Sequence, residues 1–190
     1  MTPAASPITE LAGRLATLEI AIIPGTLLFP LGEVVSRMAT AYQADGAFFE
    51  RSGDHMNALA AWSYALGWMD AGCCLGLVRA GAPRRGWFFG NLECPGPEDR
   101  VEEKVSRYRR LLADACTAAH PAADPESALF PAGLRLIMVA RVHLSWGTAF
   151  ISSGRMGNAL ASYSYGHAWL DAGMRCGLLS AENSRDIFTI

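Results

Sequence analysis

Apolar side chains recur every three or four positions along most of this chain, and that spacing is typical of helices with one buried face. The first such run follows Ser6 and Pro7, which suit a helix cap and a first-turn proline, and we expect it to end at Pro24–Gly25. Its apolar face would consist of Ile8, Leu11, Leu15, Leu18 and Ile22. The opening segment is therefore predicted to be a single helix.

The helical spacing continues beyond this first run. A second helix is predicted from Pro30 to Ser52–Gly53, and a third helix, capped by Asp54, from there to about Arg79. A fourth helix begins with Glu98, whose carboxylate suits a first turn because the helix dipole favours anions there. Its apolar face would hold Val101, Val105, Tyr108, Leu111, Leu112 and Ala115. Because alternating strand patterns are scarce, the predicted fold class is all-α.

The third helix occurs a second time, 101 residues later in the chain. Asn57–Val78 and Asn158–Leu179 are identical at twelve of 22 positions without a gap. The match extends upstream, since Leu28–Val78 and Leu129–Leu179 share 21 of 51 positions, again without a gap. A repeat of this length indicates that one supersecondary unit is built twice.

This repeat sets the predicted domain organisation. Residues 1–80 would form a first three-helix unit, residues 81–97 a linker, and residues 98–190 a second three-helix unit with a C-terminal tail. A unit of about 80 residues can bury only a limited core, and duplication supplies a second matching apolar face. We therefore expect the two tandem units to pack as one helical bundle with approximate internal twofold symmetry.

Small residues line one stripe of the repeated helix, which predicts close packing against a neighbour. The stripe consists of Ala58, Ala61, Ala65 and Gly72 in the first copy, and of Ala159, Ser162, Gly166 and Gly173 in the second. A glycine inside a helix costs about 0.5–1 kcal/mol relative to alanine. We therefore expect a neighbouring backbone or aromatic ring to occupy the space of a Cβ at Gly72 and Gly173.

The composition narrows the possible partners and setting. With 51% apolar and 18% charged residues the chain can form a core, and its net charge of −2 lacks the basic surplus of nucleic-acid binders. We therefore do not expect a nucleic-acid partner. The five cysteines contain no C-x-x-C pair, which fits a reduced, cytoplasmic setting. The most apolar run, Ile20–Leu31, is shorter than the roughly 20 residues of a membrane span, so no membrane segment is expected.

The candidate site consists of polar or amphipathic positions that recur in both copies of the repeated helix. They are Ser63, Tyr64, Trp68 and Asp70 in the first copy and Ser164, Tyr165, Trp169 and Asp171 in the second. A buried carboxylate without a hydrogen bond costs several kcal/mol, so binding or catalysis is one explanation for Asp70 and Asp171. The other explanation is structural, with each carboxylate accepting from a tyrosine hydroxyl or from helix-start amides. Both explanations stay open, and the structural one is favoured.

Two other sets of residues have side chains suited to chemistry or binding. In the linker, Arg84, Arg85 and Trp87 could grip an acidic partner or stack on bases, although linker aromatics more often cover a bundle. The four histidines are not at equivalent repeat positions and form no Glu-x-x-His pair, although His143 and His167 could meet between antiparallel helices. No catalytic residue, metal site or cofactor is predicted, since phosphate-binding glycine loops and nucleophile–base motifs are lacking.

The repeated block also carries a resemblance to a known family. The residues concerned are Gly53-Asp54, Asn57-Ala58-Leu59-Ala60, Ser63-Tyr64, Trp68-x-Asp70-Ala71-Gly72 and Gly76-Leu77. Together they resemble the signature of the archaeal domain-of-unknown-function family numbered 357. The second copy is similar to the same signature, with Arg155 in place of the aspartate. The resemblance implies two tandem copies of a compact helical unit and no established activity.

Two functional interpretations follow from these observations. The first is a non-enzymatic helical scaffold or protein-interaction module, with a protein partner or self-association, because the charge is mild and catalytic motifs are lacking. The alternative is a small-molecule-binding or catalytic bundle that uses Trp68, Asp70, Trp169 and Asp171 around a pocket between the units. Carboxylates bonded to protein groups would favour the first interpretation, and carboxylates open to a common cleft would favour the second.

Overall fold

The computed structural model describes residues 7–81, 90–181 and 188, and within these ranges the chain is an all-α bundle, as predicted. The six helices of these ranges are α1 (Pro7–Leu15), α2 (Phe29–Arg51), α3 (His55–Cys74), α4 (Glu98–Ala118), α5 (Phe130–Ser152) and α6 (Met156–Arg175). Helices α1–α3 form one unit and α4–α6 the other. The exact domain limits 1–80, 81–97 and 98–190 remain a prediction.

The duplication is reproduced in the structure almost residue for residue. Helices α5 and α6 begin and end 101 positions after α2 and α3. Each unit also closes with a short antiparallel ribbon that sequence periodicity did not predict. In the first unit β1 (Glu19–Ile20) pairs with β2 (Val78–Arg79), and in the second β3 (Ala119–Pro121) pairs with β4 (Leu179–Ala181). The repeat therefore includes the approach to the second helix as well as the two long helices.

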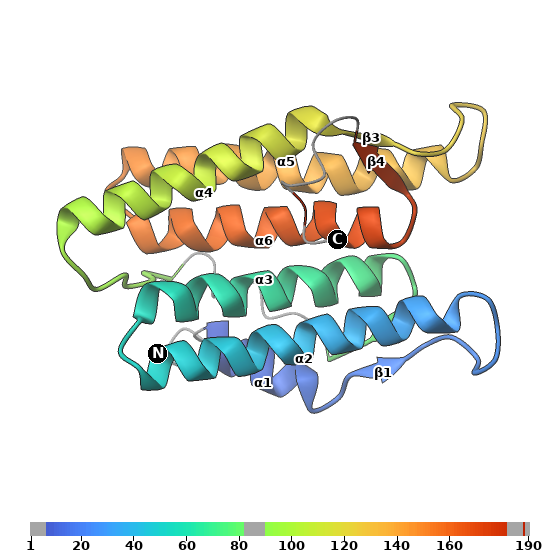
Figure 1. Cartoon of the computed structure of the whole chain (residues 1–190), viewed down its shortest axis with the longest axis horizontal. Coiled ribbons are helices and arrows are strands. Elements are labelled where there is room, and N and C mark those ends of the chain that lie inside the picture. Colours follow the sequence, from blue (N-terminus) through green and yellow to red (C-terminus); the bar gives the residue numbers. More distant parts are fainter. Residues whose placement is uncertain (1–6, 82–89, 182–187, 189–190) are drawn as a thin grey trace.

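Helices α3 and α6 form the centre of the bundle, where the two units meet. They lie side by side and run in the same direction, with α2 and α4 in front of them and α1 and α5 behind in Figure 1. Equivalent positions of the two helices face each other, since a Cβ on Gly67 of α3 would lie 2.7 Å from the Cβ of its counterpart Ala168 on α6. This arrangement is the expected approximate twofold, with its axis along the two central helices.

The first helix ends earlier than the sequence predicted. Helix α1 stops at Leu15, and the chain then forms β1, whose Ile20 pairs with Val78. Leu18, Ile20 and Ile22 alternate with polar or small residues, so the same side chains fit a strand as well as a helix. Residues 19–20 form a strand because they pair with the segment that follows α3. The prediction of one continuous helix to Pro24–Gly25 was wrong.

Helix α3 also ends before the predicted limit near Arg79. It ends at Cys74, and Gly76 follows with a φ of 71°, a left-handed conformation that glycine adopts without steric cost. The Leu77 amide then donates back to the Gly72 carbonyl at 2.9 Å. This turn reverses the chain into β2, and α6 ends in the same way at Gly177, whose φ is 69°.

The expected close packing at Gly72 and Gly173 is present, but the neighbours are aliphatic side chains. A Cβ on Gly72 would lie 2.5 Å from Cγ1 of Val35, and one on Gly173 would lie 2.6 Å from Cδ1 of Leu179. The prediction of a backbone or aromatic neighbour was wrong at these positions. Those neighbours occur at other glycines: the Trp62 ring covers Gly46, the Tyr163 ring covers Gly147, and the Tyr165 carbonyl approaches Gly67.

Within the described ranges one helix, α5, is long and apolar enough to cross a membrane by length and composition alone. Its most apolar 18 residues have a mean hydropathy of 1.2, and a third of them are buried in the bundle. The buried side is formed by Gly133, Leu136, Ile137, Ala140, His143 and Gly147. The sequence prediction that there is no membrane segment stays a prediction.

Candidate functional site

Two tyrosine–aspartate pairs join the central helices of the two units. The Tyr165 hydroxyl of α6 donates to Oδ2 of Asp70 on α3, at 2.5 Å. In the twofold-related position the Tyr64 hydroxyl of α3 donates to Oδ2 of Asp171 on α6. Four of the eight side chains predicted as a candidate site from the repeat are thus brought together in reciprocal pairs. Each pair links one unit to the other across the α3–α6 contact.

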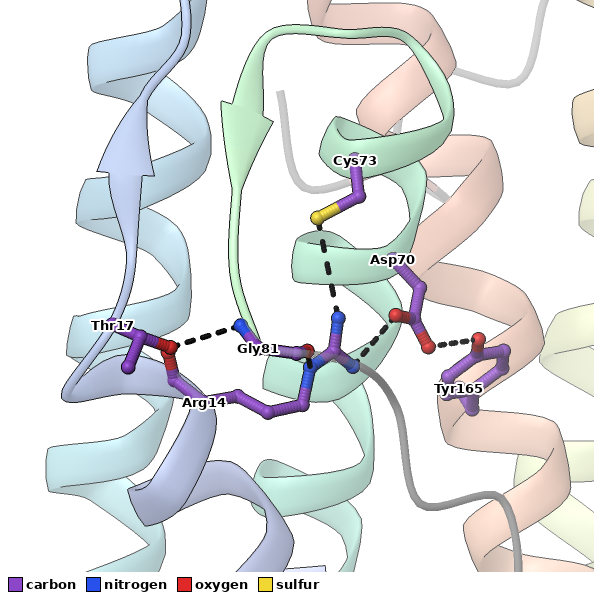
Figure 2. Close-up of polar contacts among 6 residues, drawn as sticks. All are labelled: Arg14, Thr17, Asp70, Cys73, Gly81 and Tyr165. Atoms are coloured by element: carbon purple, nitrogen blue, oxygen red, sulfur yellow. Dashed lines mark hydrogen bonds and ion pairs between the residues drawn. The ribbon is translucent and has the colours of Figure 1, made fainter.

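Asp70 has a second partner that comes from α1. Nη1 of Arg14 lies 2.6 Å from Oδ1 of Asp70, and the arginine side chain is only 5% exposed. Figure 2 shows Arg14 passing between α1 and α3, with Asp70 at its tip and Tyr165 on the far side of the carboxylate. Nε of Arg14 also donates to the Gly81 carbonyl at 3.1 Å. The guanidinium therefore ties α1 and the end of β2 to the Asp70–Tyr165 pair.

Asp171 has a different second partner. Its carboxylate is 1% exposed, and its Oδ2 lies 3.8 Å from Nε2 of His167, one turn earlier on α6. The position equivalent to His167 in the first unit is Leu66, and the position equivalent to Arg14 in the second unit is Ala115. The repeated tyrosine–aspartate pairs are thus shared by the two units, whereas the cationic or imidazole group beside each carboxylate is particular to one unit.

The environment of Tyr165 suits a hydrogen-bond donor. Burial raises the pKa of its phenol well above 10, and the Asp70 carboxylate raises that pKa further because a phenolate beside it would be repelled. The hydroxyl therefore keeps its proton at neutral pH and donates to Asp70. This arrangement holds the carboxylate in place, and no proton is available from Tyr165 for acid–base chemistry near pH 7.

The other predicted positions complete the same structural contact. Ser63 donates to the Leu59 carbonyl of its own helix at 2.7 Å, and Trp68 is fully buried. Ser164 crosses to the Ala60 carbonyl of α3, also at 2.7 Å. Trp169 packs beside the Tyr165 ring, with 6.3 Å between the ring centroids. Of these four side chains, Ser164 joins the two units by a hydrogen bond, whereas the Ser63 hydroxyl bonds within α3.

Sequence reasoning missed Arg14, although a signal was present. Arg14 follows Leu11 by three positions and therefore lies on the apolar face of α1, where an arginine requires a partner. Asp70, a carboxylate in an otherwise apolar helix, required a partner as well. Because Arg14 and Asp70 both lie on apolar faces of the same unit, the sequence could have suggested that they form an ion pair.

A pocket of about 410 Å³ opens between the units, on the side of α2 and α4. Its lining comes from four helices and consists of Tyr42, Asp45, Phe49, Asn57, Ala60, Ala61, Tyr64, Tyr108, Leu111, Tyr163, Ser164 and His167. Among the predicted candidate residues only Tyr64 and Ser164 are in this lining. Trp68, Asp70, Trp169 and Asp171 are not among its lining residues, and a pocket built on those four residues stays a prediction.

His143 on α5 and His167 on α6, which could meet between antiparallel helices, each contact an aromatic ring. His143 is buried against the Tyr165 ring, 4.4 Å between centroids, and burial lowers its pKa to about 3, so it is neutral at pH 7. His167 contacts Asp171 and the Phe188 ring. Within the described ranges no group of three or more histidine, cysteine or acidic residues could hold a metal ion. The linker candidates Arg84, Arg85 and Trp87 lie outside the described residues.

The fold and this contact define a class of protein: a duplicated three-helix unit joined through two parallel central helices. The chain belongs to the family described as "Protein of unknown function (DUF357)", whose model matches residues 8–78 and 107–179. The two matched segments fall within the two units, one in each, so the family unit is present twice. No curated protein and no solved structure matches the chain.

Proposed function

We propose that this protein is a non-enzymatic helical scaffold that binds a partner protein through the outer face of α5. The observation that carries the proposal is a row of exposed apolar side chains on that helix. We call this row the α5 face; it consists of Leu134 (47% exposed), Met138 (58%), Val142 (40%) and Trp146 (39%). Spaced four residues apart, they extend over about 18 Å of one helix.

The first unit provides an internal reference for this surface. The equivalent positions on α2 are Glu33, Arg37, Ala41 and Asp45, all of them exposed, and three of the four are charged. The same fold thus accepts charged residues at these positions, so packing within the unit does not require apolar ones. Contiguous exposed apolar side chains commonly mark a protein-interaction site. The difference between α2 and α5 therefore supports a binding role for the second unit.

The charges around the α5 face indicate the chemistry of its partner. Residues 130–152 contain no aspartate or glutamate, and Arg135 and Arg141 are exposed beside the apolar row. A second copy of this chain would bring two such arginine-flanked faces together, which like charges oppose. We therefore propose a different protein, which presents an amphipathic segment with apolar anchors and acidic flanks.

Catalysis is not part of this proposal. Both repeated aspartates are bonded to protein groups, and the exposed surface of Asp70 is restricted by Arg14 and Tyr165. These contacts hold the carboxylates in structural pairs, which supports a scaffold role for them over that of a general base. The net charge of −2 supports a protein partner over nucleic acid or an anionic membrane surface. A cytoplasmic setting also remains part of the proposal.

A photo-crosslinking experiment with a matched control tests the α5 face. A photoreactive residue replaces Ser145, beside the apolar row, or Ala44, which is the equivalent exposed position on α2. We expect a defined protein adduct in native extract from position 145 and none from position 44. The crosslinked protein, once purified, should bind the full chain directly through an apolar segment with acidic flanks.

A substituted α5 face then measures the energy of this contact. The triple variant Leu134→Glu, Met138→Arg, Val142→Ala carries the residues of α2 and should melt close to the wild type, while its partner affinity falls by about 2 kcal/mol or more. Trp146 is kept because its ring packs against His143. Unchanged affinity of the triple variant would contradict the proposal. Two further results would also contradict it. The pure wild-type chain could self-associate, or float with anionic vesicles, while the triple variant does neither.

A further inference from the structure

The pocket between the units has a lining rich in aromatic rings. Among the described residues that line it, none is a lysine or an arginine, and five carry phenol or phenyl rings: Tyr42, Phe49, Tyr64, Tyr108 and Tyr163. The only carboxylate among these described lining residues belongs to Asp45. The face of an aromatic ring is negative, so rings gathered around one space attract a cation. The lining therefore favours a positively charged group that also has apolar surface.

One wall of the pocket is a pair of rings on α2 and α3. The centroids of Tyr42 and Tyr64 lie 4.3 Å apart, and the Tyr64 hydroxyl donates to the buried Asp171 carboxylate. A hydroxyl that donates to a carboxylate carries more negative charge, because hydrogen-bonded groups polarise one another. The Tyr64 ring is therefore a better partner for a cation than a phenol without such an acceptor.

The twofold-related ring pair has a different neighbour. His143 and Tyr165 pack with 4.4 Å between their centroids, and Trp146 lies against His143 with a separation of 5.0 Å. The first-unit position that corresponds to Trp146 is Asp45. The first unit thus has a carboxylate where the second unit adds a third ring. A ligand that matches both a ring pair and a carboxylate is an organic cation.

The equivalent place in the second unit is also contacted by the linker. Nδ2 of Asn158 donates to the Gly90 carbonyl at 2.8 Å. The counterpart of Asn158 is Asn57, which lines the pocket but is bonded to Asp54 and Lys104. Because the polar atoms of Asn57 are engaged by these neighbours, the electrostatic attraction for a ligand comes from the rings and from the Asp45 carboxylate.

Cations on α4 lie near the pocket without being among its lining residues. The ammonium group of the buried Lys104 is 5.8 Å from the centroid of the Tyr108 ring, so the fold already uses that ring to hold a cation. Burial lowers the pKa of Lys104, whereas the Asp54 carboxylate raises that pKa and balances the charge. Arg107 and Arg109 are exposed, so water and salt screen their charges.

We propose that the pocket binds a small molecule that carries a quaternary ammonium group. The cation would lie against the rings of Tyr42, Tyr64 and Tyr108, with the exposed Asp45 carboxylate at the open side. A quaternary ammonium suits this lining because it has no N–H donors and its methyl groups pack on rings. The volume of about 410 Å³ is within the range of small-molecule sites. This proposal goes beyond the scaffold function and does not depend on the α5 face.

Two probes of nearly the same shape isolate the contribution of the charge. Choline carries a trimethylammonium group, and its neutral analogue dimethylbutanol has a carbon atom in place of the nitrogen. Ligand-observed NMR of the methyl signals measures the binding of each probe to the full-length protein. We expect saturable binding of choline that is at least about tenfold tighter than that of dimethylbutanol, a difference of about 1.4 kcal/mol.

Matched pairs of variants locate the binding. Asp45→Asn removes the carboxylate and Tyr108→Leu removes a ring, and each should weaken choline binding by about threefold or more. Glu33→Gln removes an exposed carboxylate of α2 that is not among the lining residues, and Tyr108→Phe keeps the ring. Both of these control variants should bind choline like the wild type. Thermal melts confirm that each variant is folded.

Several results would overturn the proposal: no saturable binding of choline, equal binding of the two probes, or an equal loss of choline binding in Asp45→Asn and Glu33→Gln. A short peptide with a trimethyl-lysine residue carries the same cation on a protein chain. Tighter binding of that peptide than of choline would overturn the assignment to a small molecule. The triple variant of the α5 face should bind choline like the wild type, so a failure of the α5 contact and a failure of the pocket proposal are separate results.

Discussion

Gly67→Ala should lower the free energy of unfolding by about 2 kcal/mol, whereas Gly13→Ala should raise it by about 0.5–1 kcal/mol. Both glycines lie inside helices, but their surroundings differ. A Cβ on Gly67 would lie 2.6 Å from the Tyr165 carbonyl oxygen and 2.7 Å from the Ala168 Cβ on the facing central helix. A Cβ on Gly13 would meet nothing within 4 Å. The same substitution is therefore predicted to have opposite effects on stability.

Urea unfolding followed by circular dichroism measures both changes on one scale. The effect at Gly67 requires α3 and α6 to move apart, because the obstacle is backbone and cannot rotate away. The effect at Gly13 is the ordinary gain in helix propensity. A stabilising or neutral Gly67→Ala would contradict the close contact of the two central helices, and Gly13→Ala checks that the measurement detects a gain.

Arg14→Met should cost about 2–3 kcal/mol, the second large effect that the structure predicts. The methionine keeps most of the apolar stem of the arginine. It removes the positive charge beside the Asp70 carboxylate, which keeps only the hydrogen bond from the Tyr165 hydroxyl. Asp70 is about a fifth exposed, so water recovers some of the loss and the cost stays below that of a fully buried pair. The free energy of unfolding at neutral pH measures the change.

A second substitution tests whether the cost of Arg14→Met comes from the unpaired charge. Arg14→Met combined with Asp70→Asn removes that charge and keeps an oxygen that can accept from Tyr165. The double variant should recover at least about 1 kcal/mol relative to Arg14→Met alone, which is a clear coupling energy for neighbouring residues. Additive costs of the two single changes would show instead that Arg14 acts mainly by packing and by its bond to Gly81.

Most of the fold could be predicted from the sequence because the repeat and the helical spacing agree. Helices α2 and α3 and their copies begin and end at equivalent positions, and the Asp54 cap is present, with the Asn57 amide donating to its carboxylate at 3.0 Å. Arg155 provides no side-chain cap in the second copy, as expected. Helical spacing and helix caps depend on residues close together in the chain, so they can be recognised in a single sequence.

Contacts between distant elements were harder to predict. The end of α1 depends on pairing with residues near Val78, and Leu18 and Ile22 fit both the helical and the strand spacing. The repeat revealed that Asp70 and Asp171 have equivalent positions, but not that each would receive a hydroxyl from the other unit. Arg14 was overlooked because it lies outside the longest repeated stretch. The pocket lining was missed because four helices contribute to it, and a single sequence does not show how those helices lie relative to one another.

The two units share their inner contacts and differ on their outer surfaces. The tyrosine–aspartate pairs and the covered glycines occur in both units, whereas the α5 face and the linker contact at Asn158 are found in the second unit alone among the residues described. This distribution is what we expect of a duplicated scaffold in which the packing positions kept one role and the exposed positions acquired separate ones. It also supplies internal controls, because most surface substitutions in one unit have a natural counterpart in the other.

The central claim is that the two units form one cooperative bundle through α3 and α6. Fluorine NMR of the full chain labelled with 5-fluorotryptophan tests it directly, since four of the five tryptophans lie in the two units: Trp62 and Trp68 report on the first and Trp146 and Trp169 on the second. As urea is added, the folded signals of all four should disappear at one common midpoint, and Gly67→Ala should shift all four together. Separate midpoints for the two units, or a Gly67→Ala shift confined to the first unit, would contradict the account.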